Sequence, residues 1–283
     1  MSRRAIVLAV GGAAGLLAAA AVAALGILTA PRPVRLEATV VLREGWTLFD
    51  LARELERQGV CEARDFVAAA TDPVLVRGLG LPADDAEGFL FPATYRLAVP
   101  TPAPRIVTRL VRTWHERAGR LLEQRAERVA AVGRRLGRDG RLALVTIASM
   151  VEAETAVADE RPRVASVIWN RLDGLDPALT RLQVDPTASY GCRRLPRLAS
   201  CARYGGRGPA TRTMLADAAN PYNTYRREGL PPGPIGNPGL ASLRAALDPE
   251  RTAYLFYVAR GDGSGRHTFS RTYEEHRRAA ARR

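Results

Sequence analysis

The stretch from residue 142 to residue 172 constrains the fold of this chain most strongly. Its first half places apolar residues at the i, i+3, i+4 and i+7 positions of one helical face: Leu144, Ile147, Ala148 and Val151. Two carboxylates, Glu152 and Glu154, follow, and a rotation of roughly 100° per residue puts them on opposite edges of that face. A half-dehydrated carboxyl group has a raised pKa, as a general acid working near neutral pH requires. By position alone, however, two solvated helix glutamates are the commoner outcome.

Length and composition are those of a globular protein with one large domain or two modest ones. The chain has 283 residues, of which 47% are hydrophobic and 25% are charged. The net charge is +13, but all 42 basic residues are arginine, which indicates a coding bias more than a binding surface. No arginine-rich block with interleaved aromatic residues is present, so we expect no nucleic-acid partner. A basic exterior still favours anionic partners such as membrane phospholipid and anionic wall polymers.

The N-terminus has the pattern of a membrane anchor. Residues 5–30 carry no charge and are long enough to cross a hydrocarbon core of roughly 30 Å as a helix. Arg3 and Arg4 precede this run, and no comparable basic cluster immediately follows it. This charge asymmetry predicts a single pass through the cytoplasmic (inner) membrane, with the N-terminus in the cytoplasm and the body of the protein outside it. A cleavable signal peptide has a shorter apolar core. We therefore expect an uncleaved anchor, although residues 21–23 offer a small-x-small cleavage site.

Residues 34–99 predict a small α+β module. Residues 35–42 alternate like a strand, and Thr47 is a plausible N-cap with Asp50 three residues later. A second helix is expected near residues 63–71. This order resembles a LysM fold, although a generic strand–helix–helix unit would have the same pattern. After the proline-rich break at residues 101–104, the sequence predicts one long helix to about residue 136.

Cysteine usage and motif content exclude several classes of chemistry. In an exported chain, Cys192 and Cys201 can form a disulfide bond worth about 2 to 3 kcal/mol, which leaves Cys61 over. The histidines are scattered, and no Cys/His spacing fits a metal site. Neither a nucleotide-binding glycine loop nor a G-x-S-x-G nucleophile motif is present. We expect no metal and no cofactor.

Several polar clusters follow the two glutamates. In chain order they are E-R at 160–161, N-R-L at 170–172, L-Q-V-D-P-T at 182–187, P-Y-N-T-Y at 221–225, G-L-P-P-G-P-I at 229–235 and H-T-F at 267–269. Pro162 can start the helix that carries Arg171, whose simplest partner is Glu152, Glu154 or Glu160. The dense Pro and Gly residues fix a loop rather than loosen it. Singly, each cluster is more often structural than functional.

Together with A-S-M-V-E-A-E-T at 148–155, these clusters in this order resemble the YceG-like (MltG) family of membrane-anchored endolytic lytic transglycosylases. The resemblance covers about residues 34–275. It implies cleavage of the β-1,4 bond between N-acetylmuramic acid and N-acetylglucosamine in peptidoglycan. The muramyl C6 hydroxyl would attack C1 and leave a 1,6-anhydro end, so a second catalytic carboxylate is not needed. The family also suggests a place beside the wall-synthesis machinery, where the enzyme would limit glycan strand length.

The resemblance assigns the catalytic role, first acid and then base, to Glu152. Helix geometry does not choose between the two glutamates, so Glu154 is the second candidate, with Arg171 as a supporting residue. Residue type and motif position suggest the following saccharide contacts: Gln183, Asp185, Thr187, Tyr222, Asn223 and Thr224. The segment 192–210 departs from the family pattern and leaves the outer cleft undefined.

We therefore predict an exported α+β protein. Its expected parts are an anchor (residues 1–31), a small LysM-like lobe (32–100), a connecting helix (101–140) and a larger mixed α+β catalytic lobe (141–283). One alternative is a muramidase-type hydrolase that uses Glu152 with Glu154 or Asp185. The other is a non-catalytic wall-binding protein that uses the LysM-like lobe. The carboxylate-bearing motifs argue against this second alternative, because binding alone would not need them.

Overall fold

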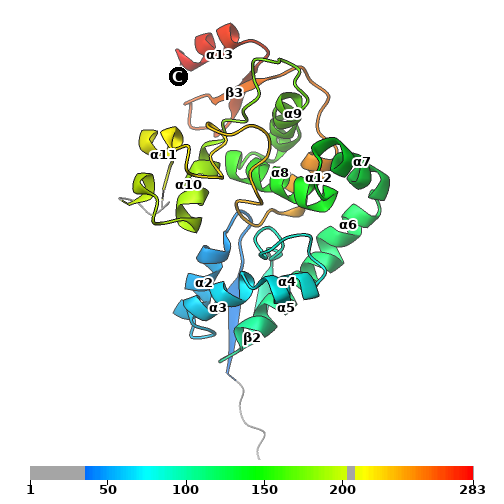
Figure 1. The fold of residues 1–283 in the computed structure, drawn as a ribbon, viewed down its shortest axis with the longest axis vertical. Coiled ribbons are helices and arrows are strands. Elements are labelled where there is room, and N and C mark those ends of the chain that lie inside the picture. The colour runs from blue at the N-terminus through cyan, green and yellow to red at the C-terminus, as the bar shows by residue number, and fades with distance from the viewer. Residues whose placement is uncertain (1–35, 203–207, 283) are drawn as a thin grey trace, which may run out of the picture. The chain divides into compact units, whose positions relative to one another are not determined.

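The structure is a computed structural model that describes residues 36–202 and 208–282 (Figure 1). The chain divides into two units, Met1–Leu36 and Glu37–Arg283, and the described helices and strands all belong to the second. The predicted anchor at residues 5–30 lies outside the described residues. Among the described helices, none is both long and apolar enough to cross a membrane.

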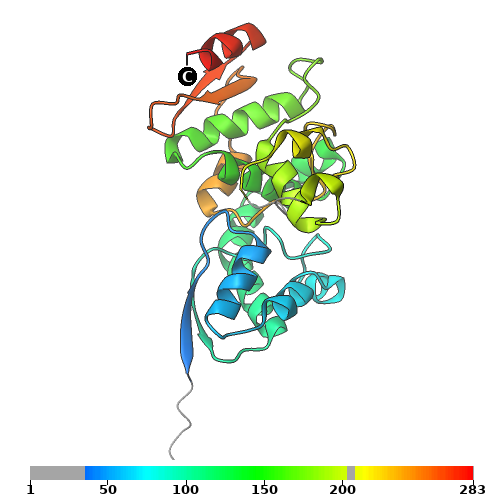
Figure 2. The ribbon, with the colours of Figure 1, turned by 90° about the vertical axis from the view of Figure 1, so that its left-hand side faces the viewer.

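The N-terminal part contains two strands and three helices. These are β1 (Glu37–Val41), α2 (Leu48–Arg57), α3 (Ala63–Ala70), α4 (Pro73–Gly78) and β2 (Thr94–Ala98). β1 and β2 pair antiparallel, with Val40 opposite Tyr95. The predicted cap is confirmed: the Thr47 hydroxyl accepts from the Asp50 N–H, and the Asp50 carboxylate accepts from the Thr47 N–H. Figure 2 shows these elements, in blue and cyan, at one end of the unit and the C-terminal strands at the other.

The prediction of one long helix after residue 101 was wrong. The segment forms α5 (Ala103–Trp114), a π-helical turn η1 (His115–Gly119), α6 (Arg120–Glu123) and α7 (Ala126–Leu136). A π-helical turn holds more residues than an α-helical one and therefore rotates the apolar face. Buried Ala118 and Leu122 thus follow Trp114 into the core, and Arg125 then leaves the helical conformation (φ −121°, ψ 30°).

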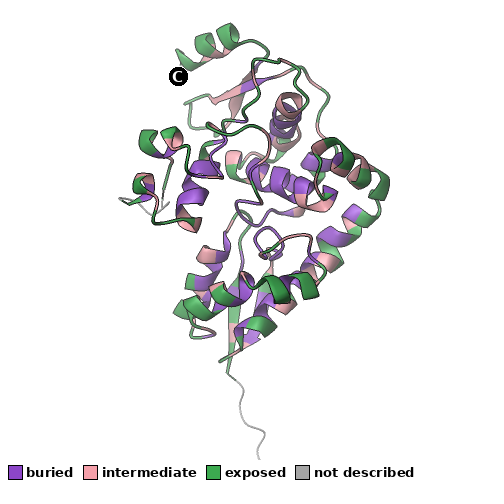
Figure 3. Ribbon diagram, viewed as in Figure 1, coloured by how far each residue is buried: buried purple, intermediate pink, exposed green. Residues whose placement is uncertain are grey.

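Helix α8 (Gly140–Glu154) is the central element of the unit. It packs against α7, α9 (Arg161–Leu172) and α12 (Leu240–Leu247), and every residue from 143 to 151 is buried. Figure 3 shows this burial along α8. Its first residue must be glycine, because a Cβ on Gly140 would lie 2.0 Å from the Val129 carbonyl oxygen. The predicted amphipathic stripe was therefore too narrow: α8 is covered on all sides, and its glutamates lie where it emerges from the core.

The remaining elements are η2 (Ala158–Glu160), α10 (Asp185–Arg194), η3 (Ala199–Cys201), α11 (Arg212–Ala216), β3 (Phe256–Ala259), β4 (His267–Ser270) and α13 (Tyr273–Ala280). Of these elements, α10 packs against α8, whereas β3, β4 and α13 pack on one another. β3 and β4 pair antiparallel, with Val258 opposite Thr268. Cys192 and Cys201 form the predicted disulfide bond, with their Cα atoms 5.1 Å apart. One hydrophobic core includes residues from Val40 to Leu247. The described residues confirm an α+β protein in which helices dominate.

Candidate active site

The end of α8 sends its two glutamates into different surroundings. Glu152 is enclosed by hydrogen-bond donors: Arg161 Nη2 lies 3.1 Å from its Oε1, and the Gly239 N–H and the Ser242 hydroxyl donate to its Oε2 at 3.0 and 2.8 Å. Only 7% of the Glu152 side chain and 11% of the Arg161 side chain are exposed. Both carboxylate oxygens are therefore occupied by groups of the protein itself.

Two of the three donors to Glu152, the Gly239 N–H and the Ser242 hydroxyl, come from the start of α12. Gly239 is the N-cap of that helix, where free N–H groups and the helix dipole favour a negative charge. A Cβ on Gly239 would lie 1.9 Å from Oε1 of Glu44, so a side chain at this position would require the exposed Glu44 carboxylate to move. Partial burial and the charge of Glu152 raise the pKa of Glu44. Glu152 thus joins the end of α8 to the starts of α9 and α12.

Glu154 instead lines an open pocket of about 410 Å³. Among the described residues, one group donates a hydrogen bond to its carboxylate, the Tyr257 hydroxyl, at 2.9 Å from Oε2. Burial raises the pKa of Glu154 to about 7; the Tyr257 hydrogen bond and the charge of Arg171 act in the opposite direction, and the charge of Asp185 adds to the rise. Within the described residues, Glu154 therefore combines access to a pocket with a pKa suited to proton transfer at neutral pH.

Predicted residues of the 182–187 motif line the same pocket. Gln183 and Asp185 are both exposed there, and the Tyr225 hydroxyl donates to Asp185 Oδ1 at 2.5 Å. Gln183 has a φ of 53°, the only positive φ of a non-glycine residue in the described chain. Such a conformation costs on the order of 1 to 3 kcal/mol and is concentrated at functional sites. The Thr224 carbonyl oxygen, which accepts from the Gln183 N–H at 3.2 Å, helps to hold it.

Arg171 lines the pocket but makes none of the predicted salt bridges. Its guanidinium donates to the carbonyl oxygens of Leu255 and Leu182, each at 2.7 Å. The prediction was wrong because α9 turns back along α8, so that its first residue, Arg161, lies beside Glu152, whereas Arg171 lies at its far end near β3. Arg171 therefore joins α9 to β3 and to the segment before α10.

The other predicted saccharide contacts lie inside the protein. Thr187 and Thr224 are at most 1% exposed and share a hydroxyl–hydroxyl hydrogen bond of 3.0 Å. Asn223 is fully buried, and its amide donates to the carbonyl oxygens of Met214, Leu215 and Asp217. Tyr222 packs edge-to-face on Tyr190 and faces a separate pocket. The P-Y-N-T-Y motif at 221–225 therefore shapes the loop behind the site. Thr187, Tyr222, Asn223 and Thr224 support the fold and do not face the Glu154 pocket.

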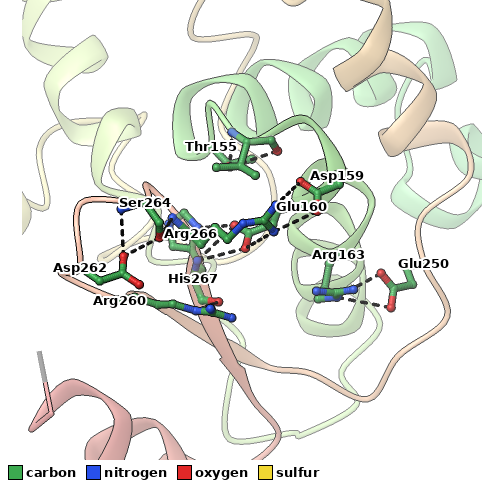
Figure 4. Close-up of polar contacts among 11 residues, drawn as sticks. Thr155, Asp159, Glu160, Arg163, Glu250, Arg260, Asp262, Ser264, Arg266 and His267 are labelled. Atoms are coloured by element: carbon green, nitrogen blue, oxygen red, sulfur yellow. Dashed lines mark hydrogen bonds and ion pairs between the residues drawn. The ribbon is translucent and has the colours of Figure 1, made fainter.

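Sequence reasoning overlooked Tyr257 and Tyr225 as pocket residues. Tyr257 lies outside the motifs that carry the family resemblance, and Tyr225 is the last residue of the P-Y-N-T-Y motif, whose Tyr222, Asn223 and Thr224 were the predicted saccharide contacts. The H-T-F motif does reach the pocket through His267, whose N–H and Nδ1 contact buried Glu160, with Nδ1 to Oε2 at 2.8 Å (Figure 4). This pair attaches β4 to the turn between α8 and α9.

The fold and the site define a class of protein: a helix-dominated α+β unit in which a buried central helix ends in a glutamate at an open polar pocket. Comparison with known families agrees with the sequence motifs, because the model of the YceG-like family matches residues 18–282. The chain belongs to the YceG-like family.

Individual relatives point the same way. A Bacillus subtilis protein named endolytic murein transglycosylase is 30% identical over 219 residues, which are 76% of this chain and 52% of that protein. A Streptococcus pneumoniae protein of the same name is 26% identical over 264 residues, covering 86% of this chain and 44% of its own length. The chain thus spans about half the length of these relatives. A crystal structure of a YceG-like protein from Listeria monocytogenes superposes with a TM-score of 0.68 at 29% identity, covering 85% of this chain and 75% of that one.

Proposed function

We propose that this protein is an endolytic peptidoglycan lytic transglycosylase that cleaves the N-acetylmuramic acid–N-acetylglucosamine bond with Glu154 as the proton-transfer residue. The observation that carries the proposal is a half-buried carboxyl group with a pKa of about 7 at an open polar pocket. The name that both relatives bear, endolytic murein transglycosylase, supports the substrate and the reaction.

The choice between the two glutamates rests on their hydrogen bonds. A general acid needs an oxygen that can approach the leaving-group oxygen of the substrate. Three donors already occupy the Glu152 carboxylate, whereas Glu154 has one described partner and faces the pocket. We therefore assign proton transfer to Glu154 and a positioning role to Glu152. The sequence-based assignment of catalysis to Glu152 is the competing hypothesis, which the variants below distinguish.

The proposed reaction uses one carboxyl group twice. Protonated Glu154 donates its proton to the glycosidic oxygen while the bond from that oxygen to C1 of the muramyl residue breaks. The sugar passes through an oxocarbenium-like state. The C6 hydroxyl of the same sugar attacks C1, and the Glu154 carboxylate takes its proton, so a 1,6-anhydro bond forms and no water is consumed. Glu154 ends the reaction protonated, as it began.

Neighbouring groups support both states of Glu154. The Tyr257 hydroxyl donates to the carboxylate and orients it, and the charge of Arg171 stabilises its negative form. The carboxylate of Asp185, in the same pocket, raises the pKa of Glu154 and would stabilise positive charge that develops at C1. Asp185 is also the group that would position water in the competing hydrolase mechanism.

We further propose that the protein acts at the outer face of the cytoplasmic membrane. The uncharged run at residues 5–30 after Arg3 and Arg4 supports a single-pass anchor, and the disulfide bond suits an oxidising compartment. The order of strand, helices and strand in residues 37–98 is compatible with a LysM-like, wall-binding role. Glycan strands are thus the proposed partner, with wall-synthesis machinery close by.

One digestion experiment tests the proposal. The full chain in detergent is incubated with purified peptidoglycan, and the products are identified by mass spectrometry. Anhydro ends are expected, and the Glu154→Gln variant should lose their formation by at least about 100-fold, a typical contribution of general acid–base catalysis. Reducing ends would instead indicate a muramidase, and intact glycan would indicate a binding protein.

The matched variant Glu152→Gln separates the two glutamates. If Glu152 holds the site together, this variant should be less stable to heat but keep measurable activity below its unfolding temperature. A folded Glu152→Gln protein without activity, beside an active Glu154→Gln protein, would transfer the catalytic role to Glu152.

A further inference from the structure

A second pocket adjoins the Glu154 pocket across the last turn of α8. Its volume is about 310 Å³, near the lower end of the roughly 300 to 1,000 Å³ typical of small-molecule sites. The two pockets share Asp185, and Ala153, the neighbour of Glu154 in the chain, lines the second one. The N-terminal part of the unit also lines the second pocket, through Thr47 and Asp50. The second pocket therefore lies between segments that are far apart in the sequence.

The polar groups of this second pocket suit a neutral ligand. Arg193 Nη1 lies 2.8 Å from Asp50 Oδ2 and donates to the Thr47 hydroxyl at 3.1 Å. Because this ion pair has no net charge and Asp185 adds a negative one, the wall disfavours an anionic ligand. The paired side chains are 23% and 19% exposed, so both reach the surface of the pocket.

Apolar groups and one hydroxyl complete the wall. Ala153, Pro186 and Ile235 supply apolar surface of the kind that covers the C–H face of a sugar ring. The Ser189 hydroxyl lines the pocket and makes no hydrogen bond with the described residues. A ligand with hydroxyls, an amide and an apolar face, such as an N-acetylhexosamine, matches this combination.

We propose that the second pocket is a saccharide subsite that holds a further sugar residue of the same glycan strand, adjacent to the bond cleaved at Glu154. The inference rests on the proposed function and extends it. An endolytic cut requires the strand to continue on both sides of the cleaved bond, and the two pockets meet at the residue that lines both, Asp185. The N-terminal part would then contribute directly to substrate binding through Asp50 and Thr47.

The test measures strand binding and kinetics separately. Peptide-free glycan strands are titrated into the full-length protein, and KM and kcat for the release of anhydro ends are determined with the same strands. The variants are Arg193→Gln and Ser189→Ala, with Arg197→Gln, an exposed arginine on the following loop, as the matched control. We expect the two pocket variants to weaken strand binding and raise KM by about 3- to 10-fold each, the equivalent of one hydrogen bond. The control should match the wild type.

The outcomes separate this inference from the proposed function. Equal strand binding and equal KM in all three variants would overturn the subsite. If the wild type forms no anhydro ends but the pocket variants still bind strands more weakly than the control, the subsite stands and the proposed function fails. Ser189→Ala keeps the test decisive if Arg193→Gln fails to fold, because it removes no described side-chain hydrogen bond.

Discussion

Replacing Tyr257 by phenylalanine tests the proposed proton donor through its pKa. The Tyr257 hydroxyl donates to Glu154 Oε2 at 2.9 Å and thereby lowers a pKa that burial raises to about 7. A general acid is active in its protonated form, so the rate should fall as pH rises through about 7. Removing the hydroxyl destabilises the carboxylate, raises the pKa of Glu154 further and moves this fall to higher pH.

The magnitude follows from the strength of the lost contact. A hydrogen bond to a charged group contributes about 1.5 to 3 kcal/mol, which corresponds to roughly one to two pKa units. Because the pocket is open and water can replace part of the lost contact, we expect a shift near the lower end, about one unit. The assay is the pH dependence of kcat/KM for anhydro-end release.

Tyr254→Phe provides the matched control. Tyr254 precedes β3, its ring packs on Phe269, and its hydroxyl makes no hydrogen bond with the described residues, so its profile should coincide with that of the wild type. An unchanged alkaline limb in Tyr257→Phe, or one displaced to lower pH, would refute the assignment of proton transfer to Glu154. Glu152 would then be the better candidate, since Tyr257 makes no described hydrogen bond to it.

Three further predictions concern stability and are measured by urea unfolding. Arg161→Met leaves the enclosed Glu152 carboxylate without its cation and should lower the free energy of unfolding by about 3 to 5 kcal/mol. The control Arg163→Met removes a half-exposed ion pair with Glu250 and should lower it by less than about 1 kcal/mol. Equal losses in the two variants would contradict the buried network around Glu152. Asn237→Ala removes the side-chain amide hydrogen bonds to Leu90, Trp46 and Glu87, which join the N-terminal part to the loop before α12. This variant should lower the free energy of unfolding by at least about 2 kcal/mol. An unchanged free energy of unfolding would show that water replaces these hydrogen bonds. Reduction of the disulfide bond should lower the free energy of unfolding by about 2 to 3 kcal/mol, and a Cys192→Ser variant should show no further loss with reductant.

Local features of the fold could be predicted from sequence because their causes are local. The Thr47–Asp50 capping box, the helix start at Pro162 and the strand before residue 42 each depend on residues within a few positions of one another. The long helix after residue 101 could not be divided correctly, because its pattern of charged and apolar residues continues across the break. Trp114 and Leu122 lie in the same core on either side of the π-helical turn, an arrangement that depends on tertiary packing.

Sequence by itself also determined the family and narrowed the catalytic group to two glutamates on one helix. Helix geometry could not separate them, and only the family resemblance favoured Glu152, because the difference between the two glutamates lies in partners distant along the chain. Ser242, which holds Glu152, is 90 residues away, and Tyr257, which contacts Glu154, is 103 residues away. Only the tertiary structure surrounds the Glu152 carboxylate with hydrogen-bond donors and leaves the Glu154 carboxyl group partly buried in the wall of an open pocket. Burial and hydrogen bonding determine a pKa, and both depend on the complete fold.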